Sequence, residues 1–433
     1  MAQYDVLIIG GGAAGLMAAV RLSGGGARCA IIEQSDRVGR KILATGNGRC
    51  NLINMRGGDE HYFSRDMRRM HAVLSAFPPE KLLSEFLDLG LMTREEEDGR
   101  VYPLSGQAAS VLDTLRLAAQ ERQVEMLCGH AVTSLATTRF GLRVDLSDGT
   151  SVNARYAILA CGGRAQPTAP ADKQSRGFDA LKAMQSLGHK VHAPMPVLTA
   201  LRCDMNMLRG LKGVRVHCAL TLTDAQTHNN IKREVGEALF TDYGVSGIAA
   251  MQLSRELDKA KKCNLLIDLI PNIDENELIQ MLLSRAERMP ERPAEQFLTG
   301  MLNRMLAQNV LRAAGIAPSK HSSDLKLSEI KALARAIKQF EISVQGAQDF
   351  KSAQVMRGGL CLSGFDDTLM SKSVNGLYAC GEILDVDGEC GGYNLMWAWA
   401  SALTAADAIL SRLQLDKSRS GIGRNGIDKN NRR

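Results

Sequence analysis

The sequence predicts an α/β protein whose parallel sheet is assembled from two segments far apart in the chain. The first segment, Tyr4 to Leu22, is a short apolar run, a glycine turn and a stretch of helix-forming residues, which is the pattern of strand, turn and helix. The second, Gly376 to Leu410, repeats that order near the C-terminus. Because 433 residues exceed the size at which one core stops growing, we expect further structure between the two segments.

The overall composition is that of an ordinary globular protein, with 45% hydrophobic and 23% charged residues. The net charge of +6 is unevenly spread, since Leu415 to Arg433 holds six basic and two acidic residues. The rest of the chain is nearly neutral, so the charge does not predict a nucleic-acid partner. The basic tail has almost nothing to bury, and we expect it to be disordered.

Ten cysteines are scattered through the chain without a C-x-x-C pair or a zinc-like Cys/His spacing, and the eight histidines show no H-x-x-x-H. This pattern predicts reduced thiols and no metal site. No signal-peptide pattern and no apolar run of membrane-spanning length is present. We therefore expect a cytoplasmic protein without a membrane anchor.

The opening glycine turn fits the pattern G-x-G-x-x-G at Gly10, Gly12 and Gly15. The first glycine permits a tight turn, the second lets backbone N–H groups approach a pyrophosphate, and the third lets the helix close on the strand. A second strand, Cys29 to Ile32, ends at Glu33, 18 residues after Gly15. A carboxylate there reaches ribose hydroxyls and repels a 2′-phosphate, so the pattern predicts a dinucleotide other than NADP.

The residues that follow favour FAD over NAD. Instead of another strand-helix unit, the chain continues with Gly39 to Leu43 and the polar, glycine-rich Thr45 to Asn51. Three cations in these segments, Arg40, Lys41 and Arg49, suit a pyrophosphate or a flavin edge.

The middle of the predicted sheet also departs from an NAD dehydrogenase. A helical stretch, Ala108 to Arg122, leads to an alternating region from Val132 to Ser151, and the chain then returns to the sheet as Tyr156 to Gly163. Alternation interrupted by turn residues predicts a β-meander crossover.

The C-terminal segment supplies the other half of the expected cofactor site. Its short strand ends at Gly381-Glu382, where a carboxylate would accept a hydrogen bond from a ribityl chain. A helix then begins after Gly391-Gly392. Its N-terminal dipole would stabilise an anionic reduced flavin at the N1/O2 edge. In this order the features predict bound FAD.

At this point the sequence resembles the BaiN-like/YhiN-like family of FAD-binding oxidoreductases, within the glutathione-reductase-like flavoproteins. The resemblance runs from Gly10 to Ala402 and is most specific at two motifs, GRKILATGNGRCN and GLYACGEILDVDGECGGYNLMWAWASA. It implies an FAD-binding Rossmann-type α/β domain with an inserted β-barrel and helical subdomain. Short β-like stretches such as Val214 to Leu222, and a helical pattern at Glu275 to Ala314, independently support such an insertion.

The resemblance also implies FAD contacts on both segments. The predicted cofactor-binding residues are Gly10, Gly12, Ala13, Ala14, Gly15, Glu33, Gln34, Arg40, Lys41, Asn47, Arg49, Val132, Gly381, Glu382, Gly392, Asn394 and Leu395.

The expected organisation has the insertion between two parts of the FAD domain. Residues 1–193 form the first part of the Rossmann domain and 356–413 its C-terminal part, while 414–433 is the basic tail. Residues 194–355 form the β-barrel domain, with the helical subdomain at about 272–340.

Three segments depart from the family pattern. Arg164 to Gly177 carries basic residues in place of an acid, Val355 to Gly359 replaces a usual Val-Thr-x-Gly-Gly, and Gly364 to Asp367 lacks a glutamate. They lie toward the expected substrate side, so the resemblance does not carry over a substrate.

A flavin transfers a hydride at N5 without a protein nucleophile, so the chemistry needs positioning and one proton donor. The sequence assigns no catalytic acid or base. Cys50, Asn51, Arg357 and Tyr393 are candidates because they adjoin flavin-facing motifs, although a structural role is the simpler interpretation of each. Cys380 lies in an apolar strand and is expected in the core.

The function predicted is an FAD-dependent oxidoreductase acting on an unidentified small molecule by hydride transfer. The absence of C-x-x-C argues against a disulfide reductase, and no second G-x-G-x-x-G provides a nicotinamide domain, so NAD(P)H as reductant would visit the flavin transiently. Two alternatives stay open: an FAD-dependent tRNA-modifying protein, and a flavin-binding sensor without turnover.

Overall fold

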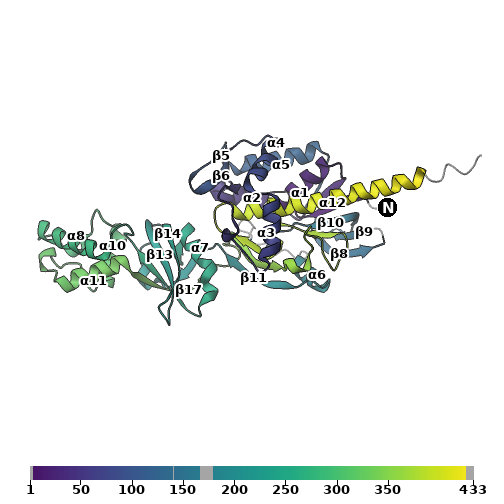
Figure 1. Cartoon of the computed structure of the whole chain (residues 1–433). Helices are drawn as coiled ribbons and strands as arrows, with labels where there is room; N and C mark the ends of the chain where they lie inside the picture. Colours follow the sequence, from purple (N-terminus) through teal and green to yellow (C-terminus); the bar gives the residue numbers. More distant parts are fainter. Residues whose placement is uncertain (1–2, 140, 166–178, 426–433) are drawn as a thin grey trace, which may run out of the picture. The chain divides into compact units, whose positions relative to one another are not determined.

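The computed structural model describes residues 3–139, 141–165 and 179–425 (Figure 1). It divides into two compact units, Met1–Met195 with Val355–Arg433, and Pro196–Gln354. The first unit holds a parallel sheet with helices, and the second a closed barrel with helices. The predicted fold class, a Rossmann-type α/β domain with an inserted β-barrel and helical subdomain, is confirmed.

The sheet of the first unit is parallel at its centre. Strand β1 (Tyr4–Ile9) lies between β2 (Cys29–Glu33) and β10 (Ser151–Leu159), and both neighbours run parallel to it. The strands are continuous apolar runs because helices and loops cover both faces of such a sheet. The outer parallel strands are β7 (Glu125–Cys128) beside β2 and β19 (Leu377–Ala379) beside β10.

Strand β10 belongs to two pairings at once. Its first residues pair antiparallel with β9 (Gly141–Leu146), which pairs with β8 (Val132–Thr138), while its later residues pair parallel with β1. The sequence predicts a meander that ends at Ser151 and a separate strand that begins at Tyr156. Asn153 is the one turn-favouring residue between those positions, and it is accommodated inside the strand, so one extended segment serves both.

Helix α1 (Ala13–Gly24) packs against α5 (Ala108–Glu121) and along α12 (Tyr393–Asn425), and α12 also contacts α3 (Met67–Ala76) and α4 (Pro79–Asp88). Every residue of α12 from Met396 to Leu403 is buried, including both tryptophans, Trp397 and Trp399. A helix buried on all sides is a core helix.

The remaining elements of this unit are α2 (Arg40–Ala44), β3 (Ile53–Asn54), β4 (Tyr62–Ser64), β5 (Thr93–Glu95), β6 (Arg100–Pro103), α6 (Ala180–Ser186), β11 (Val191–Val197), β18 (Val355–Leu360) and β20 (Val386–Gly388).

Helix α12 reaches farther than the sequence analysis expected. The chain was expected to lose regular structure from Leu415, yet the helix continues to Asn425. A helix that has already formed adds residues at little cost, and Leu415, Lys417 and Arg419 favour its continuation, although Gly421 and Gly423 do not. The rest of the basic tail, 426–433, lies outside the described residues, as do 166–177 of the departing segment that begins at Arg164.

The second unit is a six-stranded closed barrel with its own core. The strands follow the order β12-β15-β14-β13-β16-β17, and buried side chains such as Leu220, Leu222, Leu265 and Ile267 fill the interior. The barrel strands are β12 (Leu201–Cys203), β13 (Arg215–Asp224), β14 (Asn230–Phe240), β15 (Gly244–Ser246), β16 (Cys263–Asp268) and β17 (Phe340–Ala347). The helices are α7 (Ile248–Leu253), α8 (Glu275–Arg288), α9 (Ala294–Phe297), α10 (Arg304–Ala313) and α11 (Leu327–Lys338).

Among the helices described, none is both long and apolar enough to cross a membrane.

His189, which follows α6, supports a prediction about stability. Its ring is buried against Phe365, its Nε2 lies 2.7 Å from Ser371 Oγ, and burial lowers the pKa of the imidazole. The unfolded chain takes up a proton below about pH 6.5 while the folded one resists it, so stability falls as the pH drops through that value. Between pH 7.5 and 5.5 this group should cost up to about 1.4 kcal/mol of unfolding free energy.

The measurement is urea unfolding at both pH values for the wild type and for His189→Gln. The variant starts less stable at pH 7.5 but should lose less stability on acidification. Equal losses in the two proteins would show that His189 does not resist protonation.

Candidate active site

The glycine turn between β1 and α1 has the geometry of a dinucleotide loop. Gly10 has φ of +108°, and a Cβ built on it would lie 2.5 Å from the carbonyl oxygen of Ala160. A Cβ on Gly15 would lie 1.9 Å from the carbonyl oxygen of Gly10, so only glycine lets α1 approach the turn this closely. Gly12 differs, because a Cβ there meets no atom within 4 Å. The open space therefore lies at the N-terminus of α1, where the helix dipole favours an anion.

Glu33, at the end of β2, already holds this turn in place. Its Oε2 accepts a hydrogen bond from Gly11 N at 2.8 Å, and its Oε1 accepts one from Ser35 N at 2.8 Å. A carboxylate has about four acceptor positions, so two remain for hydroxyl groups. The segment that leads to Val132 crosses the same strand end, since His130 N donates to the carbonyl oxygen of Glu33 at 3.1 Å. Glu33, the glycine turn and the segment that leads to Val132 thus meet at the end of β2.

The two halves of the predicted site are in contact. Gly381 has φ of +74°, and its Cβ position is 3.0 Å from the Cβ of Ala14 on α1. The backbone of Gly381 is fixed from α12, because its N–H donates to Ser401 Oγ at 2.9 Å and its carbonyl accepts from Trp397 Nε1 at 3.1 Å. The glycine that ends β19 therefore lies directly on the first turn of α1.

Glu382 connects three segments of the chain. Its Oε1 accepts from Met356 N at 2.8 Å, and its Oε2 forms an ion pair with Lys41 Nζ at 2.6 Å. Its carboxyl group also packs on Gly163, where a Cβ would lie 2.9 Å from Cδ. The sequence placed Lys41 along a pyrophosphate or flavin edge, and the structure ties its ammonium group to Glu382. Arg40, its neighbour, lies 3.8 Å from Asp36.

The polar loop after α2 is held in an unusual backbone conformation. Gly46, Asn47, Gly48 and Cys50 all have positive φ, at +56°, 55°, +83° and 58°. Non-glycine residues in this region are strained, and such strain gathers at ligand sites. Cys50 is buried, and burial raises the pKa of its thiol to about 11. At neutral pH it is therefore a thiol, which favours the structural role over the catalytic one.

The Arg49 side chain is held by an ion pair and by an aromatic ring. Its Nη2 lies 2.5 Å from Glu96 Oε1, and its guanidinium carbon lies 4.1 Å from the centre of the Tyr102 ring. The hydrogen bond from Arg49 lowers the pKa of the Glu96 carboxyl. Arg49 is thus held at one side of the loop while Asn47 remains exposed at its tip.

The start of α12 closes onto the same loop. Gly392 has φ of +105°, and a Cβ there would lie 2.9 Å from Asn51 Oδ1. The Asn394 amide clamps the preceding turn, since its Nδ2 donates to the Gly388 carbonyl and its Oδ1 accepts from Gly388 N, both at 2.8 Å. Among the described residues, the buried Oδ1 of Asn51 has no hydrogen-bond partner. An unsatisfied buried acceptor beside a glycine-lined helix start is a place for a donor from a ligand.

These observations fit FAD. Gly12 and the start of α1 would hold the pyrophosphate, Glu33 the adenosine ribose and Glu382 the ribityl chain. Asn51, Gly392 and the N-terminus of α12 would face the flavin ring. The other predicted contacts, Ala13, Gln34, Val132 and Leu395, adjoin these groups along the chain, and their roles remain predictions.

Tyr393 contacts neighbouring residues through both its ring and its backbone. Its ring stacks on His61 with centroids 4.4 Å apart, its carbonyl accepts from the Tyr62 hydroxyl at 3.1 Å, and His61 Nδ1 lies 2.9 Å from Glu389 Oε2. Burial raises the pKa of the Tyr393 hydroxyl to about 12. This tyrosine is a neutral phenol at physiological pH. Cys380, as expected, is fully buried in the core.

Two buried acids near the C-terminal segment were not predicted from the sequence. Asp385 and Asp387 are 5% and 2% exposed, and Asp387 Oδ1 lies 3.5 Å from Arg357 Nε, whose guanidinium also packs over Phe63. Only the acidic spacing D-V-D hinted at them, because their basic partners come from distant segments. Arg357 is thus the candidate that the structure places beside buried charge.

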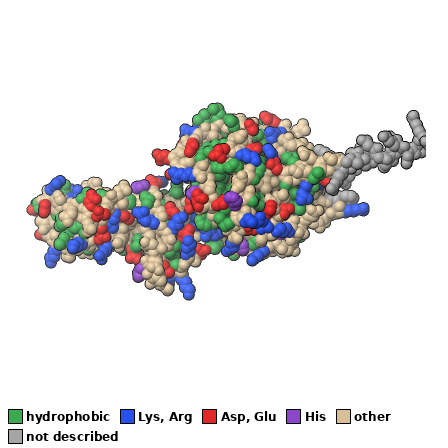
Figure 2. Space-filling model, in the orientation of Figure 1, with side chains coloured by type: hydrophobic (Ala, Val, Ile, Leu, Met, Phe, Trp, Pro, Cys, Tyr) green, Lys and Arg blue, Asp and Glu red, His purple; other side chains and the backbone are tan. Residues whose placement is uncertain are grey.

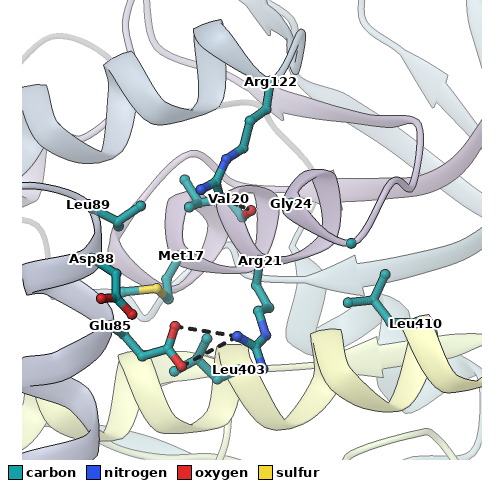
Figure 3. A pocket seen from close by; sticks show the side chains of 11 residues that line it. Met17, Val20, Arg21, Gly24, Glu85, Asp88, Leu89, Arg122, Leu403 and Leu410 are labelled. Carbon is teal, nitrogen blue, oxygen red and sulfur yellow. Dashed lines mark hydrogen bonds and ion pairs between the residues drawn. The ribbon is translucent and has the colours of Figure 1, made fainter.

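A separate cavity of about 360 Å³ lies at the other end of α1 (Figure 3). Arg21 lines it and forms two ion pairs, with Nε 2.6 Å from Asp407 Oδ1 and Nη1 3.4 Å from Glu85 Oε1. Arg122 closes it by donating to the Val20 carbonyl at 2.7 Å. None of the predicted cofactor-binding residues lines this cavity, so it is not the cofactor site. The lining residues are Met17, Val20, Arg21, Gly24, Gly25, Glu85, Asp88, Leu89, Arg122, Leu403 and Leu410.

The fold and site define a flavoprotein of the Rossmann type, and comparison with known proteins agrees. The chain belongs to the family of the HI0933-like protein Rossmann domain, whose model matches residues 4–408. It is 35% identical over 417 residues to a 3-dehydro-bile acid delta(4,6)-reductase of Clostridium scindens, covering 94% of this chain and 98% of that protein. It is 27% identical to a ribosomal RNA dihydrouridine synthase of Haemophilus influenzae, covering 94% and 99%.

Solved structures give weaker matches. A 3-ketosteroid-delta4-(5alpha)-dehydrogenase from Rhodococcus jostii RHA1 has a TM-score of 0.45 and 15% identity, covering 94% of this chain and 98% of the other. A 3-ketosteroid delta1-dehydrogenase from Sterolibacterium denitrificans has a TM-score of 0.48 and 14% identity, covering 94% and 99%. The family and its curated relative establish the chain as an FAD-dependent oxidoreductase.

Mutation should distinguish the roles of Gly12 and Gly15 in the first turn. Gly12→Ala leaves the fold unstrained, because the added Cβ meets open space, but it obstructs the pyrophosphate and should weaken FAD binding by at least about tenfold. Gly15→Ala drives a methyl group into the Gly10 carbonyl and should lower the stability of the apoprotein itself. Thermal unfolding of the apoprotein and fluorescence titration with FAD measure the two effects.

Gly236→Ala in β14 is the matched control, since its Cβ would make an ordinary 3.6 Å contact with Ala249. It should change neither quantity. Unaltered FAD affinity in Gly12→Ala would contradict the assignment of this turn to the pyrophosphate.

Proposed function

We propose that this enzyme uses FAD to reduce a carbon–carbon double bond conjugated to a carbonyl group. The names of both curated relatives support the proposal. A 3-dehydro-bile acid with 4,6 unsaturation carries such a bond beside a ketone. Conversion of uridine to dihydrouridine saturates a ring bond that is likewise conjugated to a carbonyl. One reaction type therefore accounts for two different substrates on one scaffold.

The chemistry divides between cofactor and protein. Bound reduced flavin would supply a hydride to the carbon remote from the carbonyl. The protein then has to hold the carbonyl oxygen, exclude water and deliver one proton to the other carbon. Arg357 is suited to the first task, because a guanidinium remains charged at all relevant pH values and Asp387 and Phe63 hold it in position.

A small molecule is the favoured substrate because the 35% identical relative acts on one. Uridine in RNA is the second candidate, supported by the dihydrouridine synthases at 27% identity. On the face shown in Figure 2, basic and acidic side chains are interspersed, and a body of nearly balanced charge does not favour phosphate binding.

NAD(P)H is the proposed source of electrons. With no second glycine fingerprint in the sequence, the nicotinamide would reach the flavin from the open side and leave again.

The test begins with the purified protein loaded with FAD under anaerobic conditions. NADH or NADPH should bleach the flavin absorbance, and an enone such as 2-cyclohexen-1-one or 4-androstene-3,17-dione should restore it, with the saturated ketone as product. A saturated ketone is the control and should restore nothing. Bleaching without recovery by any enone, uridine included, would sink the proposal, and no bleaching at all would favour the sensor alternative.

A second measurement separates the two substrate classes. Ribosomal RNA retention is compared at about 50 and 200 mM salt for the full chain and for a chain ending at Gln414. Small-molecule specificity predicts weak retention in both proteins. Steeply salt-dependent retention by the full chain, with dihydrouridine formed in the RNA, would favour the RNA substrate.

A further inference from the structure

A second pair of titratable side chains, one partly buried and one buried, lies beside Arg357 and Asp387. His192 on β11 and Asp385, just before β20, are joined by a contact of 2.5 Å between Nδ1 and Oδ2. The carboxylate fixes the ring and accepts the Nδ1 hydrogen, as it does wherever an Asp orients a catalytic histidine. No motif marks His192 in the sequence, so only the structure reveals this pair.

Among the described residues, the other ring nitrogen of His192 is in contact with a thiol and with no charged group. Cys361 Sγ lies 3.2 Å from Nε2 and 3.5 Å from Nδ1. Two nearly equal distances put the sulfur over the face of the ring, because an atom in line with one N–H would be far from the other nitrogen. Within the described residues no oxygen or nitrogen partners Nε2. In the described part of the chain the thiol is therefore the partner of Nε2, and because a thiol is a weak hydrogen-bonding group, a substrate could replace it.

Groups from several elements face the ring or its partners. Asp385 faces it from the segment before β20, and Cys361 from the end of β18. Arg65, which follows β4, lies 3.9 Å from Asp385 Oδ2, and Lys190 N-terminal to β11 adds a second cation near Cys361. Cys361 stays a neutral thiol, since burial and Asp385 raise its pKa.

The location connects this pair to the cofactor-binding groups. Asp385 lies three residues after Glu382, and its N–H donates to the Leu360 carbonyl at 2.9 Å. A Cβ on Gly358 would lie 3.0 Å from the carbonyl oxygen of His192, so β11 and β18 are in close contact. Arg357 follows Met356, whose N–H is held by Glu382. His192 and Arg357 thus flank one short region between the predicted ribityl contact and the start of α12.

We propose that His192 is the acid that gives the substrate its proton, with Asp385 as its positioning residue. This inference rests on the proposed enone reduction. The substrate gains a hydride from the reduced cofactor at the carbon remote from the carbonyl, and the π electrons of the double bond pass to an enolate held by Arg357. His192 Nε2 gives its proton to the adjacent carbon, a C–H bond forms and the carbonyl is restored. The imidazole regains its proton from solvent, and NAD(P)H replaces the hydride.

The test compares His192→Gln and Asp385→Asn with the wild type, all loaded with FAD. Reduction by NAD(P)H and reoxidation by ferricyanide need no proton delivered to a substrate carbon, and both rates should be unchanged. Reoxidation by an enone should fall by about 10²- to 10⁴-fold in His192→Gln, the usual contribution of a general acid, and in the same direction in Asp385→Asn. A uniform fall with all oxidants would indicate a structural role and overturn the proposal.

His71→Gln is the matched control. His71 on α3 also has Nδ1 2.5 Å from an aspartate, Asp59, but this pair is exposed at the surface. The control should keep every rate. If no enone reoxidises the wild type, the proposed function fails, whereas equal enone rates in the wild type and in His192→Gln would sink only the role of His192.

Histidine side-chain NMR gives a reading independent of turnover. Spectra that correlate ring nitrogens and carbons, recorded on the full FAD-loaded chain and assigned by the signal lost in His192→Gln, report which nitrogen of the neutral ring carries hydrogen. The Asp385 contact predicts hydrogen on Nδ1 in the wild type and its loss from that position in Asp385→Asn. Hydrogen on Nε2 in the wild type would contradict the arrangement on which the proposal depends.

Discussion

The carboxylate of Glu382 is the interaction on which the site depends. It joins Lys41 to the backbone of Met356, so one side chain near the C-terminus connects helix α2 to strand β18, which follows the insertion in the sequence. Neither contact is local in sequence. The closure entropy of such long loops is offset by the core that α12 forms with α1 and the sheet, and the cofactor-binding groups meet only because that core forms.

The sequence was sufficient for the fold class and for the glycine turn, since both are encoded locally. Gly10, Gly12 and Gly15 can be recognised from their spacing alone. The structure shows a distinct steric environment for each of them. The joined strand β10 and the length of α12 were not foreseen. Strand β10 was extended because β9 and β1 pair with its two ends, which is tertiary context overriding local preference. Helix α12 was extended because a helix that has formed adds residues at little cost.

The side chains around the predicted flavin were harder to foresee. Lys41 and Arg49 were expected along the cofactor because they are cations in a glycine-rich loop, but their acidic partners, Glu382 and Glu96, are 341 and 47 residues away. His192 had no motif at all. Pairing between distant residues leaves no trace in a single sequence, so a buried charged site becomes visible only when the strands that carry it are placed side by side.

The burial of charge beside β20 is itself an argument for function. Asp385 and Asp387 are both buried, and withdrawing two carboxylates from water costs free energy that apolar residues of similar volume would avoid. In a protein with ample core, such a group is not needed for stability. A reaction that develops negative charge on a carbonyl oxygen and consumes one proton needs a fixed cation and a titratable donor, held in place before the substrate arrives. Arg357 and His192, each fixed by its own aspartate, meet that requirement, whereas a structural ion pair would need only one of the two.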